Sequence, residues 1–318
     1  MAKSNLTFFK SEYIFFPIIL LGLISGCSTK MFEENVVDNR QLTLFAFLVA
    51  DSVFSVHLSK SVEYNSIDDF ERIYNGYIMV EKNEEKVDSF AFPYRYLWSD
   101  RPAISINEND FFLIRAGDSE GNNVWGSTII PQKISIEQID TTRVGVYQSG
   151  TLRNYLECKI VFQDPPDIDN YYQLIVTMEE WKIIDGKQLY STMNIDYLKT
   201  DSVFFIKDQS GSLLSGIDFK GTFSDYKIEG KKYPLTIRIP AYYFDRVQNN
   251  MKRSINFILL SQTADYFNYF RTRIIAEYNY DLPIIDPIKI HGNIDGGLGL
   301  IGGMASTSMS LVFTGSDF

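Results

Sequence analysis

The sequence predicts an all-β protein made of two β-sandwich domains of the immunoglobulin-like or transthyretin-like kind, with one helix in the C-terminal half. Apolar and polar residues alternate with a period of two along much of the chain, as in strands with one buried face. Turn-forming segments such as residues 117–123 separate these runs, as in antiparallel hairpins. Aromatic residues make up 15% of the chain, which suits sheets packed face to face.

The first predicted domain spans residues 39–133. Its clearest strand surrounds Phe54, Val56 and Leu58, which alternate with polar neighbours. The same alternation predicts strands over residues 41–49, 77–82, 86–90 and 111–115. Ser66 is a candidate cap for a short helix over residues 67–73. Because a proline cannot donate to a strand ladder, we place the domain boundary between Pro131 and Thr141.

The second predicted domain spans residues 141–318 and carries longer strands. We predict them over residues 144–148, 152–162, 171–184, 202–207, 233–239 and 255–261. Near residues 262–277 the apolar side chains instead recur three and four positions apart, with Ser261 or Thr263 as the N-cap. This segment is the predicted helix. The glycine-rich residues 292–303 are interpreted as a structural turn, because no predicted helix follows them that could present amides to a phosphate.

The N-terminus carries a bacterial lipobox, Ile24-Ser25-Gly26-Cys27. It ends an apolar run that starts at Ile14, follows two lysines and is too short for a permanent transmembrane helix. Residues 1–26 are therefore predicted to be a lipoprotein signal peptide, and Cys27 the acylated first residue of the mature chain. Palmitate-like acyl chains would then anchor the protein on a membrane. The alternative is a plain secretory signal in which the cysteine is incidental.

Residues 27–38 are predicted to form a lipidated tether. Ser28 is not the aspartate that would retain a lipoprotein at the inner membrane, so we expect the outer membrane. Lys30, Glu33 and Glu34 resemble a loose version of the acidic export signal of Bacteroidota lipoproteins, which would place the protein on the cell surface. A solvated tether is the alternative interpretation of these charges.

Composition excludes several functions. The formal net charge of -10 makes nucleic acid an unexpected partner. The chain has only two histidines, His57 and His291, both expected at the surface or in a loop, which removes most histidine-based catalytic and metal sites. Besides Cys27 the one cysteine is Cys158, predicted to be a half-buried, inert thiol that points away from Ile160. No catalytic residue is predicted.

Two groups of carboxylates are candidate sites. Asp164, Asp167 and Asp169 share one predicted loop, where a hard cation such as calcium could bind; an ordinary exposed turn is the alternative. No other cofactor is expected. Glu179 and Glu180 are adjacent in a predicted strand and so point to opposite faces, which argues against a glycosidase pair.

Tyr96 and Trp98 are the candidate ligand-binding or partner-binding aromatics. Both lie in a segment predicted to connect two strands, where binding residues tend to occur. Most of the other aromatic residues are expected to fill the two cores.

Three separate stretches resemble the Bacteroidota outer-membrane lipoproteins grouped as domain of unknown function 4249. The first is Asp164-Pro165 followed by residues 170–174, and the second is residues 223–225 followed by 230–233. The third, residues 287–302, is similar to the closing asparagine-isoleucine-x-glycine-glycine signature of that family. The sequence departs from the family at Leu300-Ile301, where an isoleucine-phenylalanine pair is expected.

The resemblance implies an all-β lipoprotein encoded beside TonB-dependent outer-membrane receptors, with no assigned catalytic residues. Within the signature, Asn293, Gly296, Gly297 and Gly299 are interpreted as structural, building tight turns and close backbone packing. We therefore expect a non-enzymatic accessory lipoprotein that binds a nutrient ligand or docks on a TonB-dependent transporter. The alternatives are a hydrolase acting on glycan or peptide, and a structural or adhesive module of the cell envelope.

Overall fold

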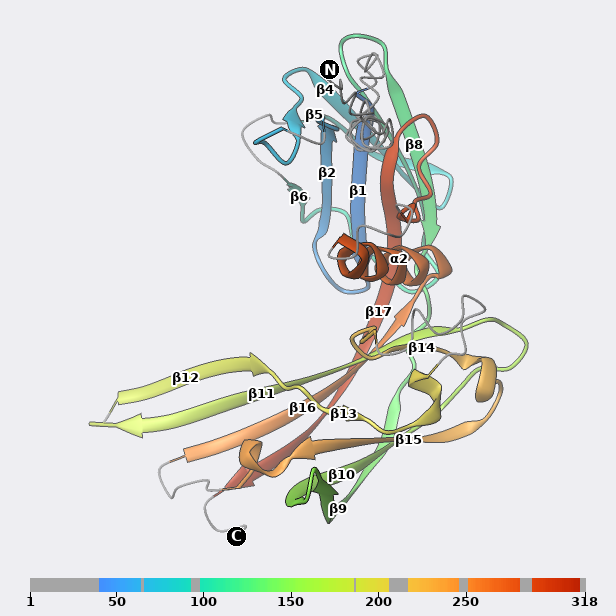
Figure 1. The fold of residues 1–318 in the computed structure, drawn as a ribbon. Helices are drawn as coiled ribbons and strands as arrows, with labels where there is room; N and C mark the ends of the chain where they lie inside the picture. Colours follow the sequence, from blue (N-terminus) through green and yellow to red (C-terminus); the bar gives the residue numbers. More distant parts are fainter. Residues whose placement is uncertain are drawn as a thin grey trace, which may run out of the picture. The chain divides into compact units, whose positions relative to one another are not determined.

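The computed structural model describes residues 40–63, 66–92, 98–185, 187–205, 217–245, 251–280 and 288–314. The lipobox with Cys27, the predicted tether and Tyr96 lie outside the described residues. Within the described residues the chain forms three β-sheets and one α-helix, α2 (Ala264–Tyr280), which confirms the predicted all-β, sandwich-like fold (Figure 1). None of the described helical segments is long and apolar enough to cross a membrane.

The strands alternate with short turns along the chain. The first eight are β1 (Leu42–Val49), β2 (Phe54–Lys60), β3 (Glu71–Arg72), β4 (Gly76–Lys82), β5 (Glu85–Phe92), β6 (Ser99–Arg101), β7 (Phe111–Gly117) and β8 (Asn123–Ile129). The next five are β9 (Ile136–Gln148), β10 (Thr151–Gln163), β11 (Tyr171–Ile184), β12 (Lys187–Asn194) and β13 (Leu198–Lys199). The last four are β14 (Thr222–Ser224), β15 (Lys232–Pro240), β16 (Met251–Gln262) and β17 (Leu298–Thr314). In the described residues of the second half lie the short 3₁₀ helices η2 (Ser202–Phe204), η4 (Asp225–Lys227) and η5 (Ala241–Tyr243).

The largest sheet has nine strands, seven of them in the order β12-β11-β16-β17-β1-β2-β3, with β14 paired to β11 and β6 paired to β2. A four-stranded sheet in the order β5-β4-β7-β8 contributes to the first hydrophobic core, and another in the order β13-β15-β10-β9 contributes to the second. Strict alternation explains the facing side chains: every second residue of β1, from Leu42 to Leu48, is buried in the first core.

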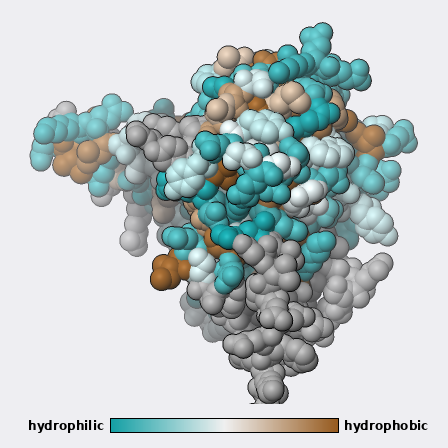
Figure 2. All heavy atoms as spheres, turned by 90° about the horizontal axis from the view of Figure 1, so that it is seen from above, coloured by the Kyte–Doolittle hydropathy of each residue, from teal (hydrophilic) through white to brown (hydrophobic). Residues whose placement is uncertain are grey.

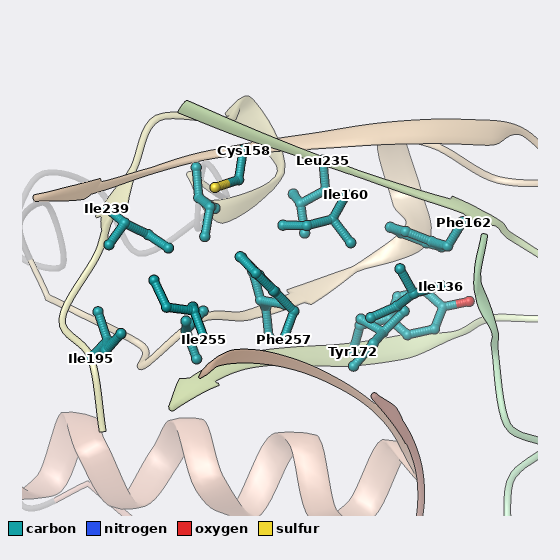
Figure 3. Packing of buried hydrophobic residues seen from close by; sticks show 14 of the residues in the cluster. Ile136, Cys158, Ile160, Phe162, Tyr172, Ile195, Leu235, Ile239, Ile255 and Phe257 are labelled. Atoms are coloured by element: carbon teal, nitrogen blue, oxygen red, sulfur yellow. The ribbon is translucent and has the colours of Figure 1, made fainter. Parts of the chain in front are cut away.

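The second core is closed by two layers of apolar side chains. Figure 3 shows Cys158, Ile160 and Phe162 of β10 facing Ile255 and Phe257 of β16 across the interior. The sequence interpretation of Cys158 as half-buried and turned away from Ile160 was wrong. Residues two positions apart in a strand share a face, so both side chains are fully buried in the same core.

Strand β17 takes part in both cores. Its first half pairs in parallel with β1, from Thr43 opposite Leu298 to Val49 opposite Met304. Its second half pairs antiparallel with β16. Ile301 lies in the first core, whereas Leu311 packs against the second. The interpretation of residues 292–303 as a turn was therefore wrong for its last six residues, which are strand.

Two further local predictions were wrong. Residues 67–70 form bends and residues 71–72 the strand β3, so the short helix over 67–73 is not formed. Residues 202–204 form a 3₁₀ turn in place of the start of a strand. The cause is Asp201, whose carboxylate accepts the backbone N–H of Val203 at 3.1 Å and caps that turn.

Helix α2 begins close to its predicted start. Thr263 is the N-cap, since its hydroxyl accepts the backbone N–H of Tyr266 at 3.4 Å and its carbonyl accepts that of Phe267 at 3.0 Å. The helix covers one face of the large sheet with aromatic rings. Ring centroids of Phe47 and Tyr266 lie 5.8 Å apart, and those of Phe45 and Tyr269 lie 5.9 Å apart.

His57 lies under the same aromatic layer. Its ring is 5.4 Å from that of Phe70 and 5.5 Å from that of Trp98. The residue is buried, so the expectation of a surface histidine was wrong. Strand alternation gave the correct face of the sheet, but the sequence did not show that this face is covered.

Candidate functional site

A cleft of about 490 Å³ lies where helix α2 begins. Three segments border it: residues 128–134 at the end of β8, residues 165–171 between β10 and β11, and residues 261–265 at the start of α2. Protein clefts that bind small molecules commonly have volumes of roughly 300–1,000 Å³ and often lie between two hydrophobic cores. This cleft is the candidate functional site.

Asp164 fixes the loop that forms one wall. One carboxylate oxygen accepts the hydroxyl of Tyr172 at 2.6 Å, and the other accepts the backbone N–H of Gly230 at 2.8 Å. The side chain is fully buried, and this burial raises the pKa of its carboxyl group. Asp164 is thus an internal anchor of the loop.

Asn170 closes the same loop. Its side-chain amide donates to the carbonyls of Pro165 at 3.3 Å and Ile168 at 2.9 Å, and its backbone N–H donates to Asp225 at 2.6 Å. These bonds hold the loop in one shape and leave the Ile168 side chain exposed.

The predicted calcium ligands do not assemble. Asp164 is buried and bound to Tyr172 and Gly230, whereas Asp167 and Asp169 are exposed. In the described part of the chain, no group of three or more His, Cys, Asp or Glu residues is placed to hold a metal ion. Asp167 has a φ of 65°, which identifies the segment as a tight turn.

The second wall is held by the signature asparagine. The Asn293 amide donates to Asp265 at 3.1 Å and to the Ile301 carbonyl at 2.9 Å, and its oxygen accepts the Ile301 N–H at 2.9 Å. It also lies 3.3 Å from the Ser127 carbonyl. His291 lies 2.8 Å from the other oxygen of Asp265. Asn293 therefore ties β8, β17 and α2 together behind the cleft.

The signature glycines allow backbone segments to approach closely. Gly299 has a φ of 119°, and a Cβ there would lie 1.9 Å from the carbonyl oxygen of Leu44. Gly296 has a φ of 78°, and a Cβ there would lie 2.6 Å from the carbonyl oxygen of Asn123. A Cβ on Gly297 would likewise lie 2.3 Å from the Leu42 carbonyl oxygen. Only glycine fits at these contacts.

The cleft itself is acidic and partly apolar. Its described lining includes the carboxylates Asp169 and Asp265 and no lysine or arginine. Ile129 and Ile168 project from its walls with 57% and 58% of their surface exposed. Such a surface favours a neutral or cationic ligand that has an apolar part.

Sequence reasoning missed both isoleucines. Ile168 interrupts a run of proline, aspartate and asparagine, and this solitary apolar residue in a polar loop was the available signal. Ile129 precedes Pro131 at the end of a strand, where nothing distinguishes it from a core residue.

Trp98 lies away from this cleft. Its ring is 5.8 Å from that of Phe47 on β1, and the residue remains exposed. Tyr96, predicted to act with it, lies outside the described residues. The structure thus places Trp98 at the edge of the aromatic layer under α2.

Other candidate groups are engaged elsewhere. Burial raises the pKa of the Cys158 thiol to about 12, which makes a thiolate nucleophile unfavourable. Glu180 binds Arg253 at 2.7 Å. A hollow of about 630 Å³ beside Arg40 is lined mainly by charged and polar groups, including the 2.6 Å pair of Arg40 with Glu71.

Comparison with known proteins identifies one family. A model described as domain of unknown function (DUF4249) matches residues 29–310. Among solved structures, a two fibronectin type-III domain segment from chicken tenascin matches with 8% identity over 70% of this chain and 91% of that chain, at a TM-score of 0.21. No curated protein matches the chain. Because the family match covers most of its length, the protein belongs to the family of domain of unknown function DUF4249.

Proposed function

We propose that this protein is a non-enzymatic outer-membrane lipoprotein of Bacteroidota that captures a small nutrient ligand in the cleft and delivers it to a TonB-dependent transporter. The main observation that supports this proposal is the cleft, which combines two exposed isoleucines with two carboxylates. The lipobox at Cys27 supports the membrane anchor. The resemblance of the signature residues to Bacteroidota lipoproteins supports the transporter as partner.

The chemistry of the walls defines the ligand class. Ile129 and Ile168 offer apolar contact, while Asp169 and Asp265 attract positive charge or hydrogen-bond donors. The loop and helix that carry these groups are fixed by Asp164 and Asn293, so the cleft is largely formed before a ligand arrives. A preformed site loses less entropy when it binds.

A fluorescent probe tests the cleft. We expect neutral N-phenyl-1-naphthylamine to bind the purified protein and anionic 1-anilinonaphthalene-8-sulfonate to bind more weakly. Ile168→Asp should weaken N-phenyl-1-naphthylamine binding about tenfold, because it places a charge on the apolar wall. Val87→Asp, at an exposed position on β5, is the matched control. No binding, or equal loss in the control, would contradict the proposed cleft.

The anchor and the partner need a separate experiment. Cells expressing the protein should incorporate labelled palmitate, and Cys27→Ala should abolish that incorporation. After mild detergent extraction, the acylated protein should co-purify with a TonB-dependent receptor, and its deletion should reduce nutrient uptake. Absence of both the co-purification and the uptake defect would refute the transporter role.

A further inference from the structure

Among the residues that the structure describes, the hairpin formed by β11 and β12 extends beyond the other strands of the large sheet. Strand β16 begins at Met251, which pairs with Lys182 of β11. Past that point Ile183 and Ile184 pair with Gln188 and Lys187 of β12. Figure 1 shows the two strands reaching out together at the left of the view. Every residue of β12 is exposed.

The hairpin tip, residues 181–185 and 187–190, carries apolar side chains on both faces. The exposed fractions are 57% for Ile183, 42% for Ile184, 52% for Leu189 and 57% for Tyr190. Adjacent strand residues point to opposite faces, so Ile183 and Tyr190 lie on one face and Ile184 and Leu189 on the other. In Figure 2 the projecting left-hand end, where Figure 1 places β11 and β12, shows apolar residues among hydrophilic ones.

Apolar residues on both faces indicate what kind of environment the tip occupies. A hairpin that lies flat on a protein surface needs one apolar face and keeps the other polar. Here both faces carry apolar groups beside polar ones: Gln188 lies on the face of Ile183, and Lys182 and Lys187 lie on the face of Ile184 and Leu189. Such a tip suits surroundings that offer both apolar and polar contacts on all sides. The tip therefore has the composition of a segment that inserts into its partner.

Aromatic rings and lysines lie where such a segment would meet the polar boundary of a lipid layer. The rings of Trp181 and Tyr190 lie 5.5 Å apart, and the ammonium group of Lys252 lies 5.5 Å from the Trp181 ring centroid. Tryptophan, tyrosine and lysine are enriched at membrane interfaces, because their apolar bodies and polar ends suit the headgroup region.

The charged residues at and beside the tip indicate which lipid headgroups it would contact. The tip itself includes Lys182, Asp185 and Lys187, and Lys252 lies beside it. Of the nearby acids, Glu180 is paired with Arg253 at 2.7 Å, and Glu179 lies beside Tyr190, where loss of solvation and the Glu179 carboxylate together raise the pKa of the Tyr190 phenol. Lys182, Lys187 and Lys252 outnumber Glu179 and Asp185, and Arg253 is paired with Glu180, so the described residues of this end carry a small positive excess in a chain whose net charge is -10. A basic, apolar tip is complementary to anionic headgroups.

We infer that the β11–β12 hairpin tip inserts into the headgroup region of an anionic lipid bilayer and forms a second membrane contact besides the acyl anchor. The inference requires neither acylation of Cys27 nor ligand binding in the cleft. Its failure is therefore distinguishable from failure of the proposed function. A membrane contact at the tip would also restrict how the anchored protein turns above its bilayer.

Vesicle binding tests the inference. The unacylated chain from Ser28 contains every residue of both hydrophobic cores and suits this measurement. We expect it to co-sediment with phosphatidylcholine vesicles in which about a quarter of the lipid is phosphatidylglycerol, and to bind pure phosphatidylcholine at least tenfold more weakly. Brominated lipid should quench part of the tryptophan fluorescence of the bound chain. If Trp181 is the quenched residue, this quenching should be lost in the Trp181→Phe variant.

Paired variants locate the contact. Ile183→Ser with Leu189→Ser should reduce binding about tenfold or more, and Lys182→Gln with Lys187→Gln should reduce it and flatten its salt dependence. The matched control removes two more exposed apolar side chains elsewhere, Ile67→Ser with Tyr226→Ser, at 102% and 87% exposure. It should bind as the parent does.

Three results would overturn the inference. These are failure of the parent chain to bind anionic vesicles, equal loss in the control pair, and unchanged binding in both hairpin pairs. The hairpin variants should keep the urea unfolding midpoint of the parent chain, which shows that they are folded. If the tip binds a protein partner instead of lipid, the parent chain will fail to bind anionic vesicles.

Discussion

Asp118 shows how a single side chain stabilises a turn between two strands of the first core. One carboxylate oxygen accepts the N–H groups of Glu120 and Asn122, each at 3.0 Å. The other accepts the Asn122 amide at 2.9 Å and contacts the Lys60 ammonium at 3.0 Å. Burial alone would raise the pKa of Asp118, but the donors from Asn122 and Lys60 outweigh it and lower that pKa to about 2.

Asp118→Asn should therefore destabilise the protein in a pH-dependent way. The pKa of an unfolded aspartate is near 3.8, so the stabilisation is fully present above that pH and is lost as pH falls towards 2. We expect the free energy of unfolding to drop by about 1–2 kcal/mol at neutral pH. Urea unfolding at a series of pH values measures this. Glu120→Gln, at an exposed partner of Lys60, should change stability by less than about 1 kcal/mol.

The outcome that contradicts this account is a stability difference of the same size near pH 2 and at neutral pH. The sequence showed residues 117–123 as a turn through its glycines and asparagines. It did not show that Lys60, on a distant strand, reaches the carboxylate, because that contact depends on how β2 lies beside the turn.

At the scale of elements, helix α2 covers the face of β1 that points away from the first core. Its Tyr266 and Tyr269 pack on Phe45 and Phe47 of β1, which point away from the first core. Phe47 also contacts Trp98, with 5.8 Å between ring centroids. Both faces of β1 are therefore packed, although its alternating sequence is also typical of a strand with one face in water.

Phe47→Ala should weaken this packing. We expect the free energy of unfolding to fall by about 2–4 kcal/mol, because several aromatic contacts are lost at once. Phe47→Leu should cost less than half as much, since it fills most of the volume. Chemical unfolding measures both, and the emission of Trp98 should shift in the alanine variant. A loss below about 1 kcal/mol would show that the helix does not stabilise the sheet through this residue.

Alternation predicted those strands whose two faces differ. Strands β1, β2, β4, β10, β11, β15 and β16 all overlap predicted segments. It failed for β12, which is exposed along its whole length, and for β17, whose first half is buried on both faces. In β12 and in that first half the environment does not alternate, so periodicity gives no signal. In the second half Met309, Leu311 and Phe313 do alternate with more exposed neighbours, a signal that the prediction missed.

At the scale of the whole described chain, β17 joins the two cores through continuous backbone pairing. Ile301 and Ala305 lie in the first core, and Met309, Leu311 and Phe313 pack against the second. The candidate cleft draws on segments near Ile129, Ile168 and Asp265 that are far apart in sequence. Local patterns could predict each segment but not their meeting, which depends on tertiary packing.

The shared strand predicts one cooperative unfolding transition. Single-tryptophan variants that retain Trp125 on β8 or Trp181 on β11 should report the same urea midpoint. Gly299→Ala should lower both midpoints together, because its Cβ would lie 1.9 Å from the Leu44 carbonyl oxygen. Gly150→Ala is the matched control: its φ is 79°, but a Cβ there meets nothing within 4 Å, so only backbone strain is added. Two separate midpoints would contradict the prediction.

The parallel pairing of β1 with β17 also sets an order of events during biosynthesis. Leu42–Val49 leaves the ribosome early, yet its neighbour in the sheet is Leu298–Met304, which is made long afterwards. Domains usually fold as they are synthesised, the N-terminal one first. The edge of β1 that pairs with β17 therefore stays unpaired until residues 298–304 have been made. Such an edge is a target for chaperones that keep a chain unfolded.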